Sequence, residues 1–174
     1  TMNVPELILA SSSEVYQTPP SIPTDESTPL SIPDVMNPRY SYAGGKLISE
    51  LMAINYGRDN FVRVIIFRPH NVYGPDMGWE HVLPQFVKRI MNNLKHNTEK
   101  TIKFEIQGDG SQTRAFIHIK DFVDGINHIL LKGQHLNIYH IGNPEEISIK
   151  SVAFEIAKLF DVNIEIIPGP IQFG

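Results

Sequence analysis

ELILASSSEVY, residues 6–16, changes from apolar to polar at residue 11. A short apolar run that ends in small polar residues is typical of a buried parallel strand whose last residue reaches a functional edge of the sheet. Residues 61–67, FVRVIIF, have the same β-rich character and follow a segment with helical periodicity. Strands that alternate with helices indicate an α/β fold.

The segment between these two strands contains a proline-rich loop and a helix. Residues 17–38 include six prolines, which favours an irregular loop able to lie over a site. A helix is predicted from about residue 40 to 56, with apolar Leu47, Leu51 and Ile54 at i, i+4 and i+7. Further along the chain we predict helices at residues 81–97, 121–131 and 149–160, the last capped by Ser148, and strands at 102–106, 115–119, 137–141 and 163–167.

The composition excludes several classes of protein. The 174 residues carry a formal net charge of -4 without a basic block, which argues against nucleic-acid binding. The chain lacks cysteine, so disulfides and thiolate metal sites are excluded, and no histidine spacing fits a metal motif. No apolar run approaches the roughly 18–20 residues of a membrane span, and the N-terminus does not look like a signal peptide. We therefore expect a cytoplasmic protein without a metal.

A tyrosine and a lysine in the predicted helix suggest proton-transfer chemistry. Tyr42 and Lys46 are four residues apart and therefore share one helix face. A nearby ammonium favours the ionised phenolate over the phenol. A tyrosine in this setting can take a proton from a sugar or alcohol hydroxyl and later return it.

Five segments of the chain follow one another in the order of a known enzyme family. They are LASSSEVY at residues 9–16, YAGGK at 42–46, FRPHNVYGP at 67–75, GDGSQTR at 108–114 and YHIGN at 139–143. A lone Tyr-x-x-x-Lys is a weak signal, whereas five ordered motifs are a strong one. Together they resemble the extended short-chain dehydrogenase/reductases, which include nucleotide-sugar epimerases, dehydratases and decarboxylases.

The resemblance implies part of a Rossmann-like doubly wound parallel sheet and a smaller α/β substrate-binding domain. Residues 1–75 would be the C-terminal portion of the NAD-binding domain. Residues 76–174 would bind the nucleotide sugar, with some segments returning to the sheet. The glycine-rich turn that approaches the cofactor pyrophosphate in such folds does not occur in this sequence. We therefore expect a fragment that lacks the N-terminal cofactor half and the C-terminal end of the family fold.

The resemblance also implies catalytic roles for the polar residues. Tyr42 would be the acid and base, with Lys46 as its electrostatic partner and as a ligand of the cofactor ribose. Ser12 would hydrogen-bond the reacting hydroxyl, although the assignment can shift by one residue, for example to Ser13. Glu14 would be a second base, or else a residue that caps a turn or forms a salt bridge.

Further motif residues would bind the two ligands. The cofactor-binding set implied by the resemblance is Ala10, Ser11, Tyr42, Lys46, Pro69 and His70. Within this set, His70 either lines the nicotinamide pocket or is a core histidine. The substrate-binding set, which would hold the nucleotide diphosphate, is Asn71, His81, Val82 and Arg114.

The predicted function is that of an NAD-dependent nucleotide-sugar epimerase or dehydratase that works by transient oxidation at C4 of the sugar. The resemblance also implies a role in polysaccharide biosynthesis, because the family's products usually serve as precursors of polysaccharides. A UDP-glucuronate decarboxylase-like activity is the alternative that rests on Glu14. An alternative of another class is a non-catalytic fragment unable to bind NAD alone. Family members are commonly homodimers, which predicts an interface that includes the helix carrying Tyr42.

Overall fold

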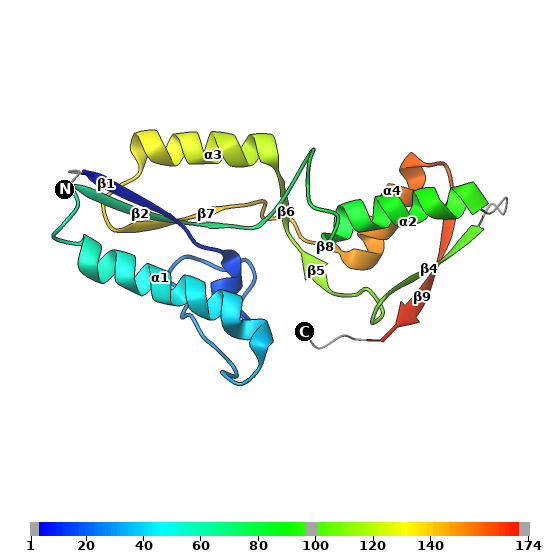
Figure 1. Cartoon of the computed structure of the whole chain (residues 1–174), viewed down its shortest axis with the longest axis horizontal. Coiled ribbons are helices and arrows are strands. Elements are labelled where there is room, and N and C mark those ends of the chain that lie inside the picture. Colours follow the sequence, from blue (N-terminus) through cyan, green and yellow to red (C-terminus); the bar gives the residue numbers. More distant parts are fainter. Residues whose placement is uncertain (1–3, 97–100, 171–174) are drawn as a thin grey trace. The chain divides into compact units, whose positions relative to one another are not determined.

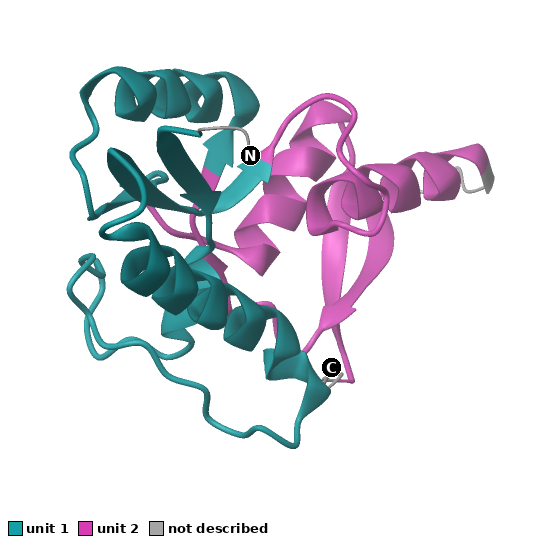
Figure 2. Ribbon diagram, turned by 60° about the vertical axis from the view of Figure 1, so that its left-hand side comes forward, with its two compact units in different colours: residues 1–72, 117–144, 174 teal, residues 73–116, 145–173 magenta. Residues whose placement is uncertain are grey.

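The computed structural model describes residues 4–96 and 101–170, which form two compact units (Figure 2). The first unit takes residues 4–72 and 117–144, and the second takes the remaining described residues. The chain passes between the units in two short strands, β3 (Asn71–Tyr73) and β6 (Phe116–His118), which pair with each other. The domain boundary predicted after residue 75 stays a prediction for the family fold.

A three-stranded parallel sheet forms the centre of the first unit, in the order β1 (Glu6–Ala10), β2 (Arg63–Pro69) and β7 (Asn137–Ile141). In the middle strand, Phe67 lies opposite Ala10. All three strands run in the same direction, so the polar residues that follow them gather at one edge of the sheet. The predicted parallel α/β architecture is confirmed.

Helices cover both faces of this sheet, with α1 (Ser41–Gly57) on one face and α3 (Ile119–Lys132) on the other (Figure 1). Successive side chains of a strand point to opposite faces. Accordingly, Val64 and Ile66 belong to the core beneath α1, whereas Ile65 belongs to the core beneath α3. This two-sided burial explains the uninterrupted apolar character of β2.

α1 packs on the sheet through small residues. Ala43, Ala53 and Gly57 are buried, whereas Leu51, from the predicted apolar stripe, is 54% exposed. A side chain at Gly57 would bring a Cβ within 2.7 Å of Cγ2 of Val64, so glycine permits the close approach. The predicted stripe thus lies on a helix, but it is divided: Ile54 packs against the sheet core, whereas Leu51 is exposed.

Two short 3-10 helices, η1 (Ser13–Tyr16) and η2 (Pro38–Tyr40), bracket the proline-rich loop. The Asn37 side chain caps η2 by accepting a hydrogen bond of 3.0 Å from the N–H of Arg39. The end of η2 leads directly into α1. The loop therefore begins and ends beside residues that the sequence assigned to the active site.

The second unit has its own core. Its elements are α2 (Val82–His96), β4 (Thr101–Gln107), β5 (Thr113–Arg114), β8 (Ile147–Ser148), α4 (Ile149–Leu159) and β9 (Asn163–Gly169). β4 and β9 pair in parallel, and β5 and β8 pair antiparallel. Alternate residues of β4 are buried against both helices, with Phe104 at the centre of the cluster. Ser148 caps α4, as predicted, because its hydroxyl accepts a hydrogen bond of 3.0 Å from the N–H of Ser151.

The search for membrane spans covered the described residues. None of their helices combines the length and the apolar character needed to cross a bilayer.

Candidate active site

Tyr42 and Lys46 lie on one face at the start of α1, beside the carboxyl end of β1. The Lys46 ammonium is 5.6 Å from the centroid of the Tyr42 ring. It also donates a hydrogen bond of 2.9 Å to the backbone carbonyl of Ala10, the last residue of β1. The Tyr42 side chain is 52% exposed, so a ligand can reach it. The shared helix face predicted from the sequence is therefore present, while the catalytic roles stay predictions.

The three consecutive serines that follow β1 have different surroundings. Ser11 is buried, and its hydroxyl donates to the carboxylate of Glu50. The Ser12 oxygen accepts a hydrogen bond of 3.2 Å from the N–H of Glu14 and so caps η1. Ser13, the first residue of η1, is half-buried. Among the described residues the hydroxyl protons of Ser12 and Ser13 have no acceptor, so either serine can donate a hydrogen bond to a ligand.

Glu14 points its carboxylate away from the protein core. Its side chain is exposed, and the ion pairs within residues 4–96 and 101–170 do not include it. Its backbone carbonyl accepts hydrogen bonds of 3.2 Å and 2.7 Å from the backbone and side-chain amides of Gln17. Its backbone thus shapes the turn, and its carboxylate is left for a ligand.

A buried ion pair joins α1 to β2 beneath these residues. Arg68 and Glu50 are each 2% exposed. The guanidinium donates from Nε to Oε1 at 2.9 Å and from Nη2 to Oε2 at 2.6 Å, a two-pronged charge-assisted contact. Burial alone would lower the pKa of Arg68, but the hydrogen bonds and charge of Glu50 outweigh it and raise that pKa. The Arg68 guanidinium therefore stays charged although it is buried.

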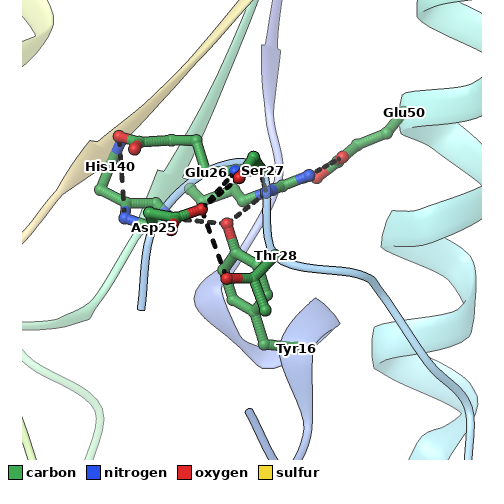
Figure 3. Close-up of polar contacts among 8 residues, drawn as sticks. Tyr16, Asp25, Glu26, Ser27, Thr28, Glu50 and His140 are labelled. Atoms are coloured by element: carbon green, nitrogen blue, oxygen red, sulfur yellow. Dashed lines mark hydrogen bonds and ion pairs between the residues drawn. The ribbon is translucent and has the colours of Figure 1, made fainter. Parts of the chain in front are cut away.

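The ion pair continues into a polar network (Figure 3). Arg68 also donates to the Tyr16 hydroxyl and, at 3.2 Å, to the backbone carbonyl of Glu26 in the proline-rich loop. The Tyr16 oxygen is 2.7 Å from Nε2 of His140. The Glu26 carboxylate in turn accepts a hydrogen bond of 3.0 Å from the backbone N–H of His140. Burial raises the pKa of Tyr16, and the charge of Arg68 offsets part of that rise.

His70 follows β2 at the same edge. The centroid of its ring lies 5.9 Å from that of the His140 ring. The backbone N–H of His70 donates a hydrogen bond of 3.0 Å to the backbone carbonyl of Ile141. A Cβ on Gly142 would overlap the imidazole, so glycine is needed there. Burial lowers the pKa of His70, and a backbone hydrogen bond with Asn143 opposes part of that shift. The buried Nδ1 itself has no hydrogen-bond partner among the described residues. A fully satisfied core histidine does not account for that nitrogen.

The structure brings part of the predicted site together. Ala10, Ser11, Ser12, Tyr42 and Lys46 gather where β1 ends and α1 begins, and Pro69 and His70 lie at the end of the neighbouring strand. Asn71 is exposed in β3. His81 precedes α2, Val82 begins it, and Arg114 is exposed in β5, where its guanidinium donates 2.7 Å to the Thr113 carbonyl. These last three belong to the second unit, and their shared role stays a prediction.

Sequence reasoning missed the residues that support this site. Glu50 is one turn beyond Lys46 in α1, and Arg68 belongs to the FRPHNVYGP motif without a role having been assigned to it. A lone acidic residue amid helical apolar residues is the signal that could have marked Glu50. Among the described residues, no group of three or more histidines and carboxylates could hold a metal.

Comparisons with known proteins show the family of the chain. The model of the NAD dependent epimerase/dehydratase family matches residues 1–142. The chain belongs to this family. The resemblance found from the five motifs is thereby confirmed.

Curated relatives include dehydratases and decarboxylases. The chain is 33% identical over 156 residues to human dTDP-D-glucose 4,6-dehydratase, covering 90% of the chain and 41% of the relative. It is 30% identical over 165 residues to UDP-glucuronic acid decarboxylase 5 of Arabidopsis thaliana, covering 92% of the chain and 45% of the relative. The chain thus spans less than half the length of these two proteins.

Solved structures share the fold. DesIV from Streptomyces venezuelae, a dTDP-glucose 4,6-dehydratase with NAD and TYD bound, superposes with a TM-score of 0.77 at 26% identity, covering 94% of this chain and 47% of that one. RMD from Pseudomonas aeruginosa, complexed with NADPH, gives a TM-score of 0.80 at 20% identity, covering 96% and 54%. Nicotinamide cofactors are thus bound by structural neighbours of this chain.

Proposed function

We propose that this chain carries the acid/base residues of an NAD-dependent nucleotide-sugar epimerase or dehydratase that oxidises C4 of the sugar transiently. The observation that carries the proposal is the exposed Tyr42 phenol beside the Lys46 ammonium, which is fixed to the end of β1. Ser12, whose hydroxyl proton has no acceptor among the described residues, lies two residues after that end. A phenol, an ammonium and a hydroxyl at the carboxyl edge of a parallel sheet suit the oxidation of an alcohol.

In this mechanism Tyr42 accepts the proton of the C4 hydroxyl as the hydride leaves C4, and returns it when C4 is reduced again. The Lys46 ammonium stabilises the Tyr42 phenolate that accepts this proton in the first half and that forms again when the proton is returned. Ser12 donates a hydrogen bond to the same sugar oxygen and orients it. NAD, when bound, would supply the hydride acceptor.

The residues present fit the nicotinamide end of that cofactor. Lys46 lies at the end of β1, where its ammonium can hydrogen-bond a ribose hydroxyl as well as Ala10. The buried Nδ1 of His70, unpaired among the described residues, offers a polar atom at the neighbouring strand end. The glycine-rich turn for the pyrophosphate is not among these 174 residues. An inactive, non-catalytic piece is therefore the alternative that NAD binding must exclude.

Glu14 favours a dehydratase over a simple epimerase. Epimerisation at C4 needs only return of the hydride to the other face of the ketone. Elimination of water needs a further base that removes a proton next to the ketone, and the exposed Glu14 carboxylate can take that role. A UDP-glucuronate decarboxylase-like reaction is the second candidate, because the same carboxylate would lie beside the substrate carboxylate and a decarboxylase is among the relatives.

We further propose that the second unit holds the nucleotide diphosphate. The exposed Arg114 can make paired hydrogen bonds to phosphate oxygens. His81, just before α2, and Val82, its first residue, would contact the base. Asn71, in β3, is proposed separately as a substrate-binding residue.

We also propose that a second copy of the protein covers the exposed side of α1. Ile48, Leu51, Met52 and Tyr56 occupy one side of this helix and are 54–71% exposed. A contiguous apolar surface of this kind marks an interaction site. Light scattering of the intact protein tests it, because Met52→Glu should convert a dimer into a monomer, and a monomeric wild type would exclude it.

The function is tested with the intact protein that contains this chain, incubated with NAD and separately with dTDP-glucose, UDP-glucose and UDP-glucuronate. Mass spectrometry of the products distinguishes loss of water from loss of carbon dioxide, and chromatographic separation of the isomeric nucleotide sugars detects epimerisation, which leaves the mass unchanged. Loss of water from one of the glucose nucleotides is expected. Tyr42→Phe is the matched control for proton transfer. Absence of turnover with all substrates, or full activity of Tyr42→Phe, would contradict the proposal.

A further inference from the structure

The buried residues Glu50 and Arg68 form hydrogen bonds to other residues in addition to the two hydrogen bonds that join them to each other. Two buried charges lose their hydration, so such a pair is weak evidence for stability by itself. Each partner here also holds a residue of the candidate catalytic segment, residues 11–16. Glu50 Oε1 accepts from the Ser11 hydroxyl, and Arg68 Nη1 donates to the Tyr16 hydroxyl.

The two ends of the catalytic segment are therefore attached to one rigid unit. A guanidinium and a carboxylate that meet through two hydrogen bonds fix each other's plane and orientation. Ser11 and Tyr16 are buried, so neither contact competes with bulk water. Ser12, Ser13 and Glu14 lie between the two attachment points. Their backbone position consequently depends on the geometry of the ion pair.

One helical turn before Glu50, α1 makes a second contact with the end of β1. Lys46 donates to the carbonyl of Ala10, and Glu50 accepts from the hydroxyl of the next residue, Ser11. Two residues one helical turn apart thus hold two consecutive residues of the strand end. Tyr42 precedes Lys46 by one further turn on the same helix face. The position of Tyr42 relative to the catalytic segment is set by these two contacts.

We propose that Glu50 and Arg68 are positioning residues, which hold residues 11–16 against the helix that carries Tyr42 without touching the substrate. This inference rests on the proposed function. It assigns the ion pair to catalysis as well as to folding. A shift of about 1 Å in a reacting group can reduce turnover about 100-fold, so loss of the pair should lower kcat far more than it changes KM.

The decisive variant is Glu50→Leu/Arg68→Met in the intact protein. Replacing both charges by apolar residues of similar volume leaves no unpaired buried charge, so the fold should survive. We expect a melting temperature near that of the wild type, retained NAD, a similar KM and a kcat lower by about 10- to 100-fold. Glu6→Gln, in an exposed ion pair of the same sheet, is the matched control and should keep full kcat.

Two further variants separate geometry from charge and guard against misfolding. Ser11→Ala/Tyr16→Phe removes the contacts between the ion pair and the segment, together with the contact of Tyr16 to His140, and leaves the ion pair itself intact. It should lower kcat in the same direction. Arg68→Lys keeps the charge, but an ammonium cannot reproduce the planar fork, so kcat should stay low. A fully active Arg68→Lys or Ser11→Ala/Tyr16→Phe variant would overturn the positioning role.

Hydrogen exchange keeps the test independent of the substrate. The amides of Ser11, Val15 and Gln17 are hydrogen-bonded to backbone carbonyls at 2.8–3.3 Å. In Glu50→Leu/Arg68→Met these amides should exchange faster while those of α1 and β2 stay protected. Unchanged protection would refute the inference whatever the activity. A wild type without turnover would refute the proposed function, and faster exchange in the variant would then leave only a structural role for the pair.

Discussion

The two ends of strand β2 each carry an arginine that is paired with a glutamate, and the two pairs differ in their surroundings. At the amino end, Arg63 pairs with Glu6 at 2.7 Å, with side chains 21% and 41% exposed. At the carboxyl end, Arg68 pairs with Glu50 at 2.6 Å, with side chains 2% and 3% exposed. The first pair links neighbouring strands at the surface, whereas the second joins the helix, the sheet and the serine segment.

The comparison shows where this fold places its polar chemistry. The middle of β2, from Val64 to Phe67, is apolar because helices cover both faces. Charged groups are therefore confined to the strand ends. Only the carboxyl end also receives the loops that carry Ser12, Glu14 and His70, in keeping with the general location of ligand sites in parallel sheets. Each prediction below contrasts a change at this end with a matched change elsewhere.

The largest expected effect is the loss of proton transfer. Tyr42→Phe should reduce kcat by about 10²–10⁴-fold, because the phenol is the only group proposed to exchange a proton with the C4 hydroxyl. Thermal stability should hardly change, since the side chain is 52% exposed. Steady-state kinetics of the intact protein provide the measurement. Tyr56→Phe, 71% exposed toward the other end of the same helix, is the control and should retain full kcat.

The next effect concerns stability. Arg68→Met alone should lower the free energy of unfolding by about 3–5 kcal/mol, because the Glu50 carboxylate stays buried without its partner. Urea denaturation followed by circular dichroism gives the value. Addition of Glu50→Leu should restore most of the loss. If the double variant were as unstable as the single one, the loss would come from packing of the arginine rather than from the unpaired charge.

A smaller effect is a dependence of stability on pH that comes from the carboxyl end. Burial lowers the pKa of His140, with Glu26 opposing and His70 and Arg68 adding to the shift. The unfolded chain therefore binds this proton more readily than the folded protein. The resulting stability is complete above the unfolded value of about 6.5 and is lost as pH falls from there toward the folded pKa.

Melting temperatures measured from pH 8 to pH 5 test this dependence. His140→Gln should flatten the decline below about pH 6.5, and the decline that remains should include the contribution of His70, whose pKa burial also lowers. His128→Gln, exposed on α3, is the control and should reproduce the wild-type curve. A His140→Gln curve as steep as the wild type would assign the dependence to other groups.

The sequence predicted the fold and the family better than it predicted the support of the site. β1, β2 and α1 follow from apolar runs and helical spacing, which are local properties. The pairing of Glu50 with Arg68, 18 residues away, depends on which face of α1 meets the sheet. The apolar stripe contributes Ile54 to the contact with the sheet, whereas Leu51 of the stripe is exposed. The small residues of the helix that are buried are Ala43, Ala53 and Gly57. Close approach of helix and sheet, rather than bulk hydrophobicity, decided the orientation.

The smallest expected effect is at the amino end of β2. Glu6→Gln should lower the free energy of unfolding by about 0.2–1 kcal/mol, because both side chains of its pair with Arg63 remain in contact with water. Urea denaturation at low salt and at about 1 M salt measures it, since an exposed pair is screened at high ionic strength and the difference should then vanish. Arg63 also donates to the carbonyls of Leu130 and Gly133, so it keeps partners when the glutamate is neutral. A loss that approached that of Arg68→Met, or that persisted at high salt, would mean that burial does not distinguish the two ends of the strand.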